Sequence, residues 1–241
     1  TEAAAEGIDT NAIDRFLTGA QREQSVLNAD RSQGVFQKDF IAFSRALISQ
    51  NRIDTGRAKA AKYSLIFDQM EAEYGVSRGV LLAFWAFETD YGGYQGNFNT
   101  LNALLTLAHD CRRPQLFRPQ VFSALELFQQ GDFDPATTTG AWAGEIGMVQ
   151  MLPDDILHNG VDGDGDGRVD IWNSLPDIFY SAANFLSQSG WQGDERWGRE
   201  VLLPADFDFS LSGSRTRQSL SDWRDLGVLQ VSGEALPVVA D

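Results

Sequence analysis

The stretch VLLAFWAFETDYGG, residues 80–93, decides how this sequence is interpreted. Eight apolar residues lead directly to Glu88, and two glycines then break the chain. Because a helix that is apolar on every side belongs inside a protein, we expect a buried helix over 78–88, capped by Ser77, with Glu88 emerging from its C-terminal end. Burial and the partial negative charge of a helix end both raise the pKa of a carboxyl group. The stretch predicts a protonated carboxyl suited to general acid catalysis, with an arginine-paired or N–H-capping glutamate as the structural alternative.

A second motif with a chemical interpretation is DGDGDGRVDIWN, residues 162–173, which matches the calcium loop of an EF-hand in one frame. The residues that would supply ligands are Asp162, Asp164, Asp166, Arg168 through its backbone carbonyl, Asp170 and Asn173. Asn173 replaces the usual bidentate glutamate, which lowers the expected affinity. A helix is expected from 175, but none directly before 162. We predict a structural Ca²⁺ site rather than a calcium switch, with a solvated acidic turn as the alternative.

Composition narrows the class of protein. The 241 residues carry a net charge of −15, which argues against nucleic acid as a partner and against electrostatic docking on anionic membranes. The longest apolar run has eight residues, so we expect no transmembrane segment. Cys111 is the only cysteine, which excludes an internal disulfide. The chain opens at Thr1 without Met, and we expect a leader to have been removed.

Hydrophobic periodicity predicts an α-dominated α+β fold. Helices are expected from Thr10 and over 35–49, 57–74, 78–88, 100–110, 114–130, 175–189 and 219–228. The 35–49 helix would place on one face Phe36, Phe40, Phe43, Leu47 and Ile48. Short strands and loops are expected after Trp191. Three regions are predicted. They are a helical N-terminal region at 1–76, a core at 77–191 that contains Glu88 and the acidic loop (residues 162–173), and a small β-containing appendage at 192–241.

The remaining candidate site residues give weaker indications of function. His109 and His158 are too few to predict a zinc site and are expected to be structural. The tryptophans Trp142, Trp172 and Trp191 fit either the core or a sugar-stacking platform. The pair Arg112-Arg113 fits either an anion clamp or a solvated pair.

Five segments occur in an order and spacing that resemble the membrane-bound lytic murein transglycosylase B family. They are ETDYG (88–92), NFNTLNALLTLAHDCRRP (97–114), AWAGEIGMVQMLP (141–153), DGDGDGRVDIWNS (162–174) and ANFLSQSGW (183–191). The resemblance covers roughly residues 10–230 and implies a lysozyme-like core. It also implies a periplasmic enzyme that cleaves the β-1,4 bond between N-acetylmuramic acid and N-acetylglucosamine of peptidoglycan, leaving a 1,6-anhydromuramoyl end.

The resemblance also implies roles for individual residues. Glu88 would protonate the glycosidic oxygen and then, as a carboxylate, accept a proton from the muramoyl 6-hydroxyl that attacks C1. The expected substrate-binding residues are Arg112, Arg113, Trp142 and Gln150, together with Tyr91 and Asn97 from the matching segments. The calcium loop of the family falls on the acidic loop already described. The sequence shows no obvious partner carboxylate for Glu88, which agrees with assistance from the N-acetyl group of the substrate.

Two departures from the family pattern leave alternatives open. Ala141 stands where the family usually has a serine that hydrogen-bonds the catalytic glutamate, and Glu145 or a water is the expected substitute. The chain also stops at LPVVAD, before the aromatic-Asn-x-Ser-x-x-Tyr segment of the family, so a truncated form or a divergent member is expected. The alternatives are a non-catalytic peptidoglycan-binding scaffold, a hydrolytic muramidase and, more distantly, a calcium-dependent structural protein. We expect a monomer whose partners are glycan strands and cell-wall enzyme complexes.

Overall fold

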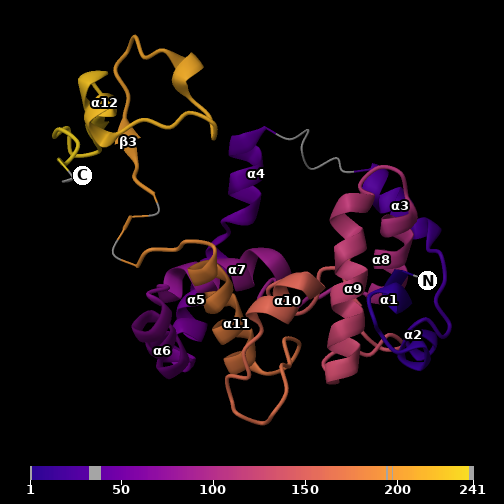
Figure 1. Cartoon of the computed structure of the whole chain (residues 1–241). Coiled ribbons are helices and arrows are strands. Elements are labelled where there is room, and N and C mark those ends of the chain that lie inside the picture. Colours follow the sequence, from indigo (N-terminus) through magenta and orange to yellow (C-terminus); the bar gives the residue numbers. More distant parts are fainter. Residues whose placement is uncertain (1, 33–38, 194, 197, 239–241) are drawn as a thin grey trace. The chain divides into compact units, whose positions relative to one another are not determined.

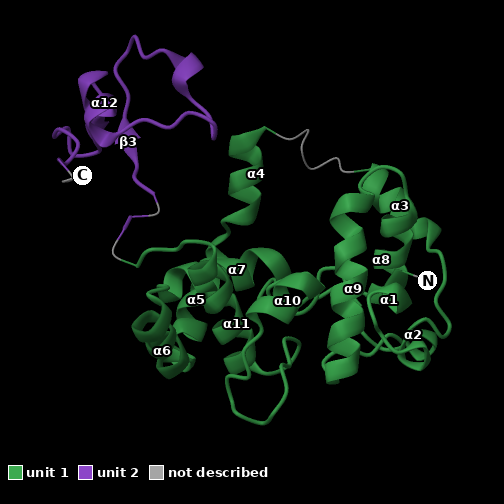
Figure 2. Ribbon diagram, viewed as in Figure 1, with its two compact units in different colours: residues 1–193 green, residues 194–241 purple. Residues whose placement is uncertain are grey.

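The computed structural model describes residues 2–32, 39–193, 195–196 and 198–238. The chain forms two compact units, residues 1–193 and residues 194–241 (Figure 2). The first unit shows no division at residue 76, because α6 (Ser64–Tyr74) packs against both α7 (Arg78–Thr89) and α11 (Leu175–Gln188). The predicted helical N-terminal region (1–76) and the predicted core (77–191) therefore belong to one compact unit.

Helices dominate the first unit, the second consists mainly of turns and loops, and the described strands are few and short (Figure 1). The other helices are α1 (Glu2–Ala5), α2 (Thr10–Phe16), α3 (Gln24–Arg31), α4 (Phe40–Leu47), α5 (Gln50–Lys62), α8 (Thr100–His109), α9 (Pro114–Gln130), α10 (Pro153–Asn159), α12 (Leu220–Asp225) and the 3₁₀ turn η2 (Phe209–Leu211). Two antiparallel pairs join β1 (Phe98–Asn99) to β2 (Thr139–Gly140) and β3 (Val201–Leu202) to β4 (Leu229–Gln230). The predicted α-dominated class is confirmed.

Local signals explain where several helices begin and end. The Asp9 carboxylate accepts a hydrogen bond from the Ala12 amide at 3.1 Å, so α2 begins at Thr10. Gly75 adopts a left-handed φ of 67° and ends α6 as expected. Ser77 occupies the N-cap position of α7, although its side chain makes no capping hydrogen bond. Helices α8 and α9 follow the predicted ranges to within one residue.

Two predictions of secondary structure are wrong. The single helix expected over 57–74 is two helices, α5 and α6, separated at Tyr63, whose backbone leaves helical geometry at φ −112° and ψ 27°. There the Tyr63 ring packs on Trp85, with centroids 6.1 Å apart, so a tertiary contact accompanies the break. A helix also precedes the acidic loop, because α10 ends at Asn159. Pro153 suits the first turn of α10, where its missing N–H costs no hydrogen bond.

Helix α7 is buried on one side rather than on every side. Leu81 and Trp85 are buried, and Trp85 meets the ring of Phe179 edge-on with centroids 5.2 Å apart. Phe84 and Phe87, in contrast, are 37% and 48% exposed. The prediction of a fully buried helix is therefore wrong, because the core already contacts the opposite face. The exposed face is the one that also carries Glu88, four residues after Phe84.

Helix α4 does not bury its apolar face. Phe36 lies outside the described residues, and α4 begins at Phe40, which is 75% exposed. None of the residues of α4 is buried. In the rest of the first unit, α8 packs along α9, and α10 contacts both α9 and α11. Helix α10 therefore links the α8–α9 pair to α11 and forms one wall of the pocket that contains Glu88.

Candidate functional site

A pocket of about 270 Å³ lies between α7, α10, α11 and the loop 141–152. It holds three carboxylic side chains, Glu88, Glu145 and Asp155. The apolar residues that line it are Phe84, Val149, Met151, Ala182, Phe185 and Leu186. Gln150 also borders the pocket. The structure thus brings two predicted site residues, Glu88 and Gln150, into one pocket.

Within the described residues, the Glu88 carboxyl group has no ion-pair partner. Glu88 is accessible from solvent, yet burial of its carboxyl among the apolar pocket walls raises its pKa, and the charge of Glu145 raises it further. Among the described residues, no arginine or lysine forms an ion pair with Glu88. The arginine-paired alternative is therefore not observed. The environment favours the protonated carboxyl that general acid catalysis requires.

Glu145 is held in the pocket by two successive tight turns. The Ala141 amide donates to the Glu145 carbonyl at 2.9 Å, and Ile146 and Met151 exchange two backbone hydrogen bonds of 2.8 and 3.0 Å. Gly144 in the first turn has a φ of 91°, and a Cβ at this position would lie 2.3 Å from a methyl carbon of Leu104. Only glycine fits there without strain. Burial outweighs the opposing effects of backbone N–H groups and of the Arg113 charge, so the pKa of Glu145 lies above its ordinary value.

Gln150 is placed by an unusual backbone. Its φ of 54° is left-handed, a conformation that costs a non-glycine residue on the order of 1 kcal/mol or more. The side-chain amide donates to the Gly147 carbonyl at 2.8 Å and to the Gln95 carbonyl at 3.3 Å. These two bonds fix the Gln150 side chain at the border of the pocket.

The two predicted arginines are pinned to a buried acid. Asp30 on α3 is 1% exposed on its side chain; it lies 2.6 Å from Arg112 and also pairs with Arg113. Burial alone disfavours the charge of Asp30, but the hydrogen bonds and charges of both arginines outweigh burial and hold its pKa below the ordinary value. The arginines are therefore not a freely solvated pair. Arg113 also stacks over the Phe117 ring, 5.0 Å from its centroid, and its charge lowers the pKa of Glu145.

Three other predicted substrate contacts lie away from the Glu88 pocket. Trp142 is half-buried against the core, and Asn97 is exposed just before β1. Tyr91 lines a different pocket, on the α5 side of α7, where its hydroxyl donates to the Arg52 carbonyl at 2.7 Å. The spacing of these three residues in the sequence does not indicate that they lie outside the Glu88 pocket.

Substitution of Tyr91 by phenylalanine tests its structural role. We expect Tyr91→Phe to destabilise the protein by about 1 kcal/mol, because the half-buried Arg52 carbonyl loses its donor. Thermal unfolding should show a decrease in Tm of roughly 2–4 °C. The KM for the glycan substrate that the family resemblance implies should stay unchanged. An unchanged Tm together with a raised KM would contradict this assignment and return Tyr91 to the substrate site.

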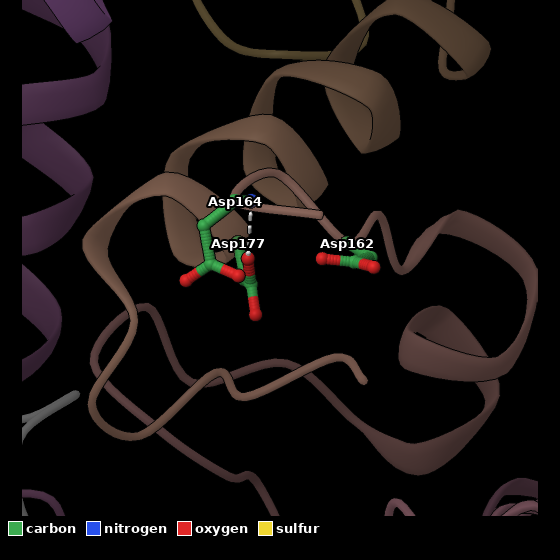
Figure 3. A group of neighbouring side chains, drawn as sticks. All are labelled: Asp162, Asp164 and Asp177. Atoms are coloured by element: carbon green, nitrogen blue, oxygen red, sulfur yellow. Dashed lines mark hydrogen bonds between the residues drawn. The ribbon is translucent and has the colours of Figure 1, made fainter. Parts of the chain in front are cut away.

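The acidic loop forms a carboxylate cluster with a residue that the motif did not include. Asp162, Asp164 and Asp177 each place an oxygen within 4.8 Å of the others (Figure 3). Asp177 lies in the first turn of α11 and is buried. Its carboxylate accepts hydrogen bonds from the Gly163 and Asp170 amides, both at 2.8 Å. An acid in the first turn of the following helix, outside the twelve-residue loop, was the signal that could have identified it.

The other predicted ligands are engaged locally. The Asp166 carboxylate accepts from the Arg168 amide at 2.9 Å, and the Asp170 carboxylate accepts from the Trp172 and Asn173 amides at 2.9 and 3.0 Å. Among the described residues, only Asp162 and Asp164 of the predicted set join the cluster. Three carboxylates, one of them buried, are nevertheless a donor set that suits a hard divalent cation.

A larger pocket of about 450 Å³ borders the acidic loop instead of Glu88. Its walls come from residues 131–139 and 168–173, with Gln95 between them. The Nε1 of Trp172 on this wall donates to the Thr139 carbonyl at 3.4 Å. Hydrogen bonds from Thr137 and Ala136 hold the pKa of Asp134 in this pocket below its ordinary value, whereas Glu88, whose pKa is raised by burial, lies in the smaller pocket.

Comparisons with known proteins agree with this geometry. A family model described as a transglycosylase SLT domain matches residues 1–240. The membrane-bound lytic murein transglycosylase B of Escherichia coli (strain K12) is 25% identical over 233 residues, which is 92% of this chain and 63% of the relative. The chain thus spans less than two thirds of the length of this curated relative.

Solved structures extend the comparison. SltB3 from Pseudomonas aeruginosa, in complex with NAG-anhNAM-pentapeptide, superposes with a TM-score of 0.89 at 38% identity and covers 98% of this chain and 63% of SltB3. SltB1 from the same organism gives 0.84 at 25% identity, covering 97% and 80%. The Escherichia coli lytic transglycosylase Slt35, in complex with calcium, gives 0.82 at 24% identity, covering 94% and 72%. The predicted lysozyme-like fold is confirmed.

Proposed function

Because the chain belongs to the transglycosylase SLT domain family, we propose that it is a lytic transglycosylase of peptidoglycan. The bond cleaved is the β-1,4 linkage between N-acetylmuramic acid and N-acetylglucosamine, and the product is a 1,6-anhydromuramoyl end. The observation that carries the proposal is Glu88, a carboxyl group with a raised pKa that lies between apolar pocket walls and forms no ion pair with any described residue. The bound NAG-anhNAM-pentapeptide of SltB3 supports this choice of product.

The proposed reaction uses one carboxyl group twice. Protonated Glu88 donates its proton to the glycosidic oxygen as the bond from C1 to that oxygen breaks. The muramoyl 6-hydroxyl then attacks C1, and its proton passes to the Glu88 carboxylate, which restores the starting state. Because the nucleophile belongs to the same sugar, the step gains the proximity advantage of an intramolecular reaction. Gln150 is proposed to orient the sugar at the pocket border.

The structure favours one second candidate, hydrolysis. The sequence showed no obvious partner carboxylate for Glu88, but Glu145 shares its pocket. A second carboxylate is what ordinary glycosidases use to activate water or to attack the sugar. A hydrolytic muramidase would release reducing muramic acid ends in place of anhydro ends.

Product analysis separates the two candidates. Purified sacculi are incubated with the protein, and the soluble fragments are analysed by mass spectrometry. Anhydromuramoyl ends, which lack one water relative to reducing ends, support the transglycosylase. Reducing ends support the muramidase. No fragments at all, with binding to sacculi retained, would overturn both and favour the non-catalytic scaffold.

Calcium is the cation we propose for the acidic loop. Asp162, Asp164 and Asp177 would hold it, with further oxygens from the neighbouring loop. Its charge would offset the mutual repulsion of the three carboxylates and tie the loop to α11. The calcium complex of Slt35, a protein of the same fold, agrees with this proposal.

Calcium binding is expected to stabilise the folded chain. At a calcium concentration about 100 times the Kd, linkage predicts a gain of about 2.7 kcal/mol. Such a gain corresponds to a rise in Tm of roughly 5–10 °C relative to protein in a chelator. Magnesium, which prefers a strict octahedron, should give a smaller rise.

The variant Asp177→Asn tests which residues are responsible. It should lose the calcium-induced rise in Tm whatever its own Tm in chelator. Asp14→Asn, an exposed site on α2, is the matched control and should keep the full rise. If the native protein has the same Tm in calcium and in chelator, the calcium proposal is wrong.

The proposed location is the bacterial periplasm, where peptidoglycan is accessible. Within the described part of the chain, no helix is both long enough and apolar enough to cross a membrane. The proposed partners are glycan strands and enzymes of cell-wall complexes, and the proposed state is a monomer. Arg112, Arg113 and Trp142 are proposed to contact the saccharide or its peptide, with both arginines anchored by Asp30.

A further inference from the structure

The threonine that follows Glu88 joins α7 to the loop that borders the pocket. Thr89, the last residue of α7, is 2% exposed. Its hydroxyl group donates a hydrogen bond of 2.6 Å to the Met148 carbonyl and accepts one of 3.0 Å from the Gly92 amide. A threonine hydroxyl has one proton to donate, so the Trp85 carbonyl, at 3.3 Å, is the weaker partner. One buried hydroxyl group therefore bonds the end of the helix that carries Glu88 to the loop that leads to α10.

Met148 is held from two sides. Its carbonyl accepts the hydrogen bond from Thr89, and its amide donates to the Ile171 carbonyl at 3.1 Å. Gly147 has a φ of 76°, and a Cβ there would lie 2.4 Å from the Ile171 carbonyl oxygen, so the backbones approach closely at this point. The Gly147 carbonyl in turn accepts from the side-chain amide of Gln150 at 2.8 Å. The turn that carries Gln150 is thus held between Thr89 and Ile171.

Strained backbone lies on both sides of the Thr89 contact. Among the described residues, the non-glycine residues with a left-handed φ are Asp90, Tyr91 and Gln150, at 52°, 62° and 54°. Such a conformation costs free energy and persists only where the surrounding contacts hold it. Asp90 and Tyr91 follow Thr89 directly, and Gln150 follows Met148 by two positions. The Thr89 hydroxyl group is a direct bond between these two strained segments.

We propose that Thr89 is a positioning residue: its hydroxyl group bonds the last turn of α7 to the loop that carries Gln150, and thereby fixes the Glu88 carboxyl relative to that side chain. This inference rests on the proposed function, in which Glu88 gives its proton to a glycosidic oxygen and Gln150 orients the sugar. Thr89 is buried and is not among the residues that line the pocket, so it is assigned no contact with the substrate. A misplacement of about 1 Å can reduce a catalysed rate by about 100-fold, which sets the scale of the expected effect.

Two pairs of proteins isolate the hydroxyl group. Thr89→Val keeps the shape of the native side chain without its hydroxyl, and Thr89→Ser differs from Thr89→Ala by that oxygen alone. With solubilised glycan strands as substrate, kcat should fall about 10–100-fold in Thr89→Val and Thr89→Ala, whereas KM should change by less than about threefold. Thr89→Ser should keep kcat within about threefold of the native value. The serine and alanine pair decides the question if Thr89→Val does not fold.

Thr106→Val is the matched control, because it also removes a buried hydroxyl group from a hydrogen bond. Thr106 on α8 is 4% exposed, and its hydroxyl accepts from the Glu23 amide at 2.9 Å. This variant should lose stability as Thr89→Val does, yet keep the native kcat and KM at a temperature where every variant is folded. An equal fall in kcat in Thr106→Val and Thr89→Val, or a Thr89→Ser no more active than Thr89→Ala, would show a merely structural role and overturn the inference.

Amide hydrogen exchange gives a test that does not depend on activity. The Met148 and Met151 amides donate backbone hydrogen bonds of 3.1 and 3.0 Å, and their exchange is followed by NMR in the full chain. Exchange should become about tenfold faster in Thr89→Val than in Thr106→Val and return towards the native rate in Thr89→Ser. If the native protein releases no fragments, the proposed function fails, and unchanged exchange in Thr89→Val would overturn the inference separately. A Thr89→Val protein with native kcat, whatever its exchange rates, would overturn the inference and leave the proposed function standing.

Discussion

Replacement of Glu88 by glutamine should reduce the release of anhydro fragments from sacculi by about 10²–10⁴-fold, the range attributed to general acid–base catalysis. Glutamine keeps the size of the side chain and its apolar contacts but has no acidic proton to give to the glycosidic oxygen. The pocket has two further carboxyl groups, Glu145 and Asp155. We expect neither to rescue the variant, because the Asp155 carboxylate accepts a hydrogen bond from the Leu152 amide and Glu145 is held in place by the turns of the loop 141–152.

The measurement is the initial rate of soluble fragment release, at the pH where the native protein releases fragments fastest. Glu71→Gln, an exposed glutamate of α6, is the control and should retain the native rate. The variant should unfold at the native Tm or slightly above it, since the desolvated acid is replaced by a neutral group. A Glu88→Gln protein that keeps more than about a tenth of the native rate would be incompatible with Glu88 as the general acid.

The second large effect is expected on stability, at Asp30. Replacement by asparagine leaves Arg112 and Arg113 without the buried carboxylate that joins α3 to the start of α9. Loss of one partner of a buried ion pair typically costs about 3–5 kcal/mol. Both arginines reach solvent, which reduces the penalty, so we expect Asp30→Asn to cost about 2–4 kcal/mol. The corresponding decrease in Tm is roughly 5–15 °C.

The Asp30 effect should depend on pH in a known direction. The pKa of Asp30 is lowered in the folded chain, so its contribution is present above the unfolded pKa of about 3.9 and is lost as pH falls through the folded value. The difference in unfolding free energy between native protein and variant should therefore be full at pH 7 and shrink in acid. Asp14→Asn, exposed on α2, should change stability by less than about 0.5 kcal/mol. Equal stability of native protein and Asp30→Asn at pH 7 would show that the two arginines find other partners.

The part of the site that the sequence predicts is the part encoded by neighbouring residues. An apolar run that ends in Glu88 is sufficient to identify the helix and its acid, and α7 extends only one residue further. Alternating aspartates and glycines likewise identify Asp162 and Asp164 as members of a cluster. Both signals are local, and local patterns do not depend on where distant segments pack.

The remainder depends on contacts between distant segments. Asp177 joins the cluster because α11 starts beside the acidic loop, and Glu145 meets Glu88 because two turns fold the loop 141–152 onto α7. The separation of α5 from α6 coincides with the packing of Tyr63 on Trp85, although residues 57–62 have helix-forming composition. A single sequence contains these pairings only implicitly, since neither partner has an unusual local pattern.

The contact that ends the first unit has a consequence for how the chain can be rearranged. The indole N–H of Trp191 donates to the Gly75 carbonyl at 2.9 Å, and Gly193 lies against Gly75. The segment from 75 to 193, which contains Glu88, Glu145 and the acidic loop, therefore enters and leaves at one point. Chain ends that meet in this way can be joined by a short linker, as in circular permutation. The Glu88 pocket is accordingly built within a closed loop of the chain, and a short linker between residues 75 and 193 would join its ends without spanning the pocket.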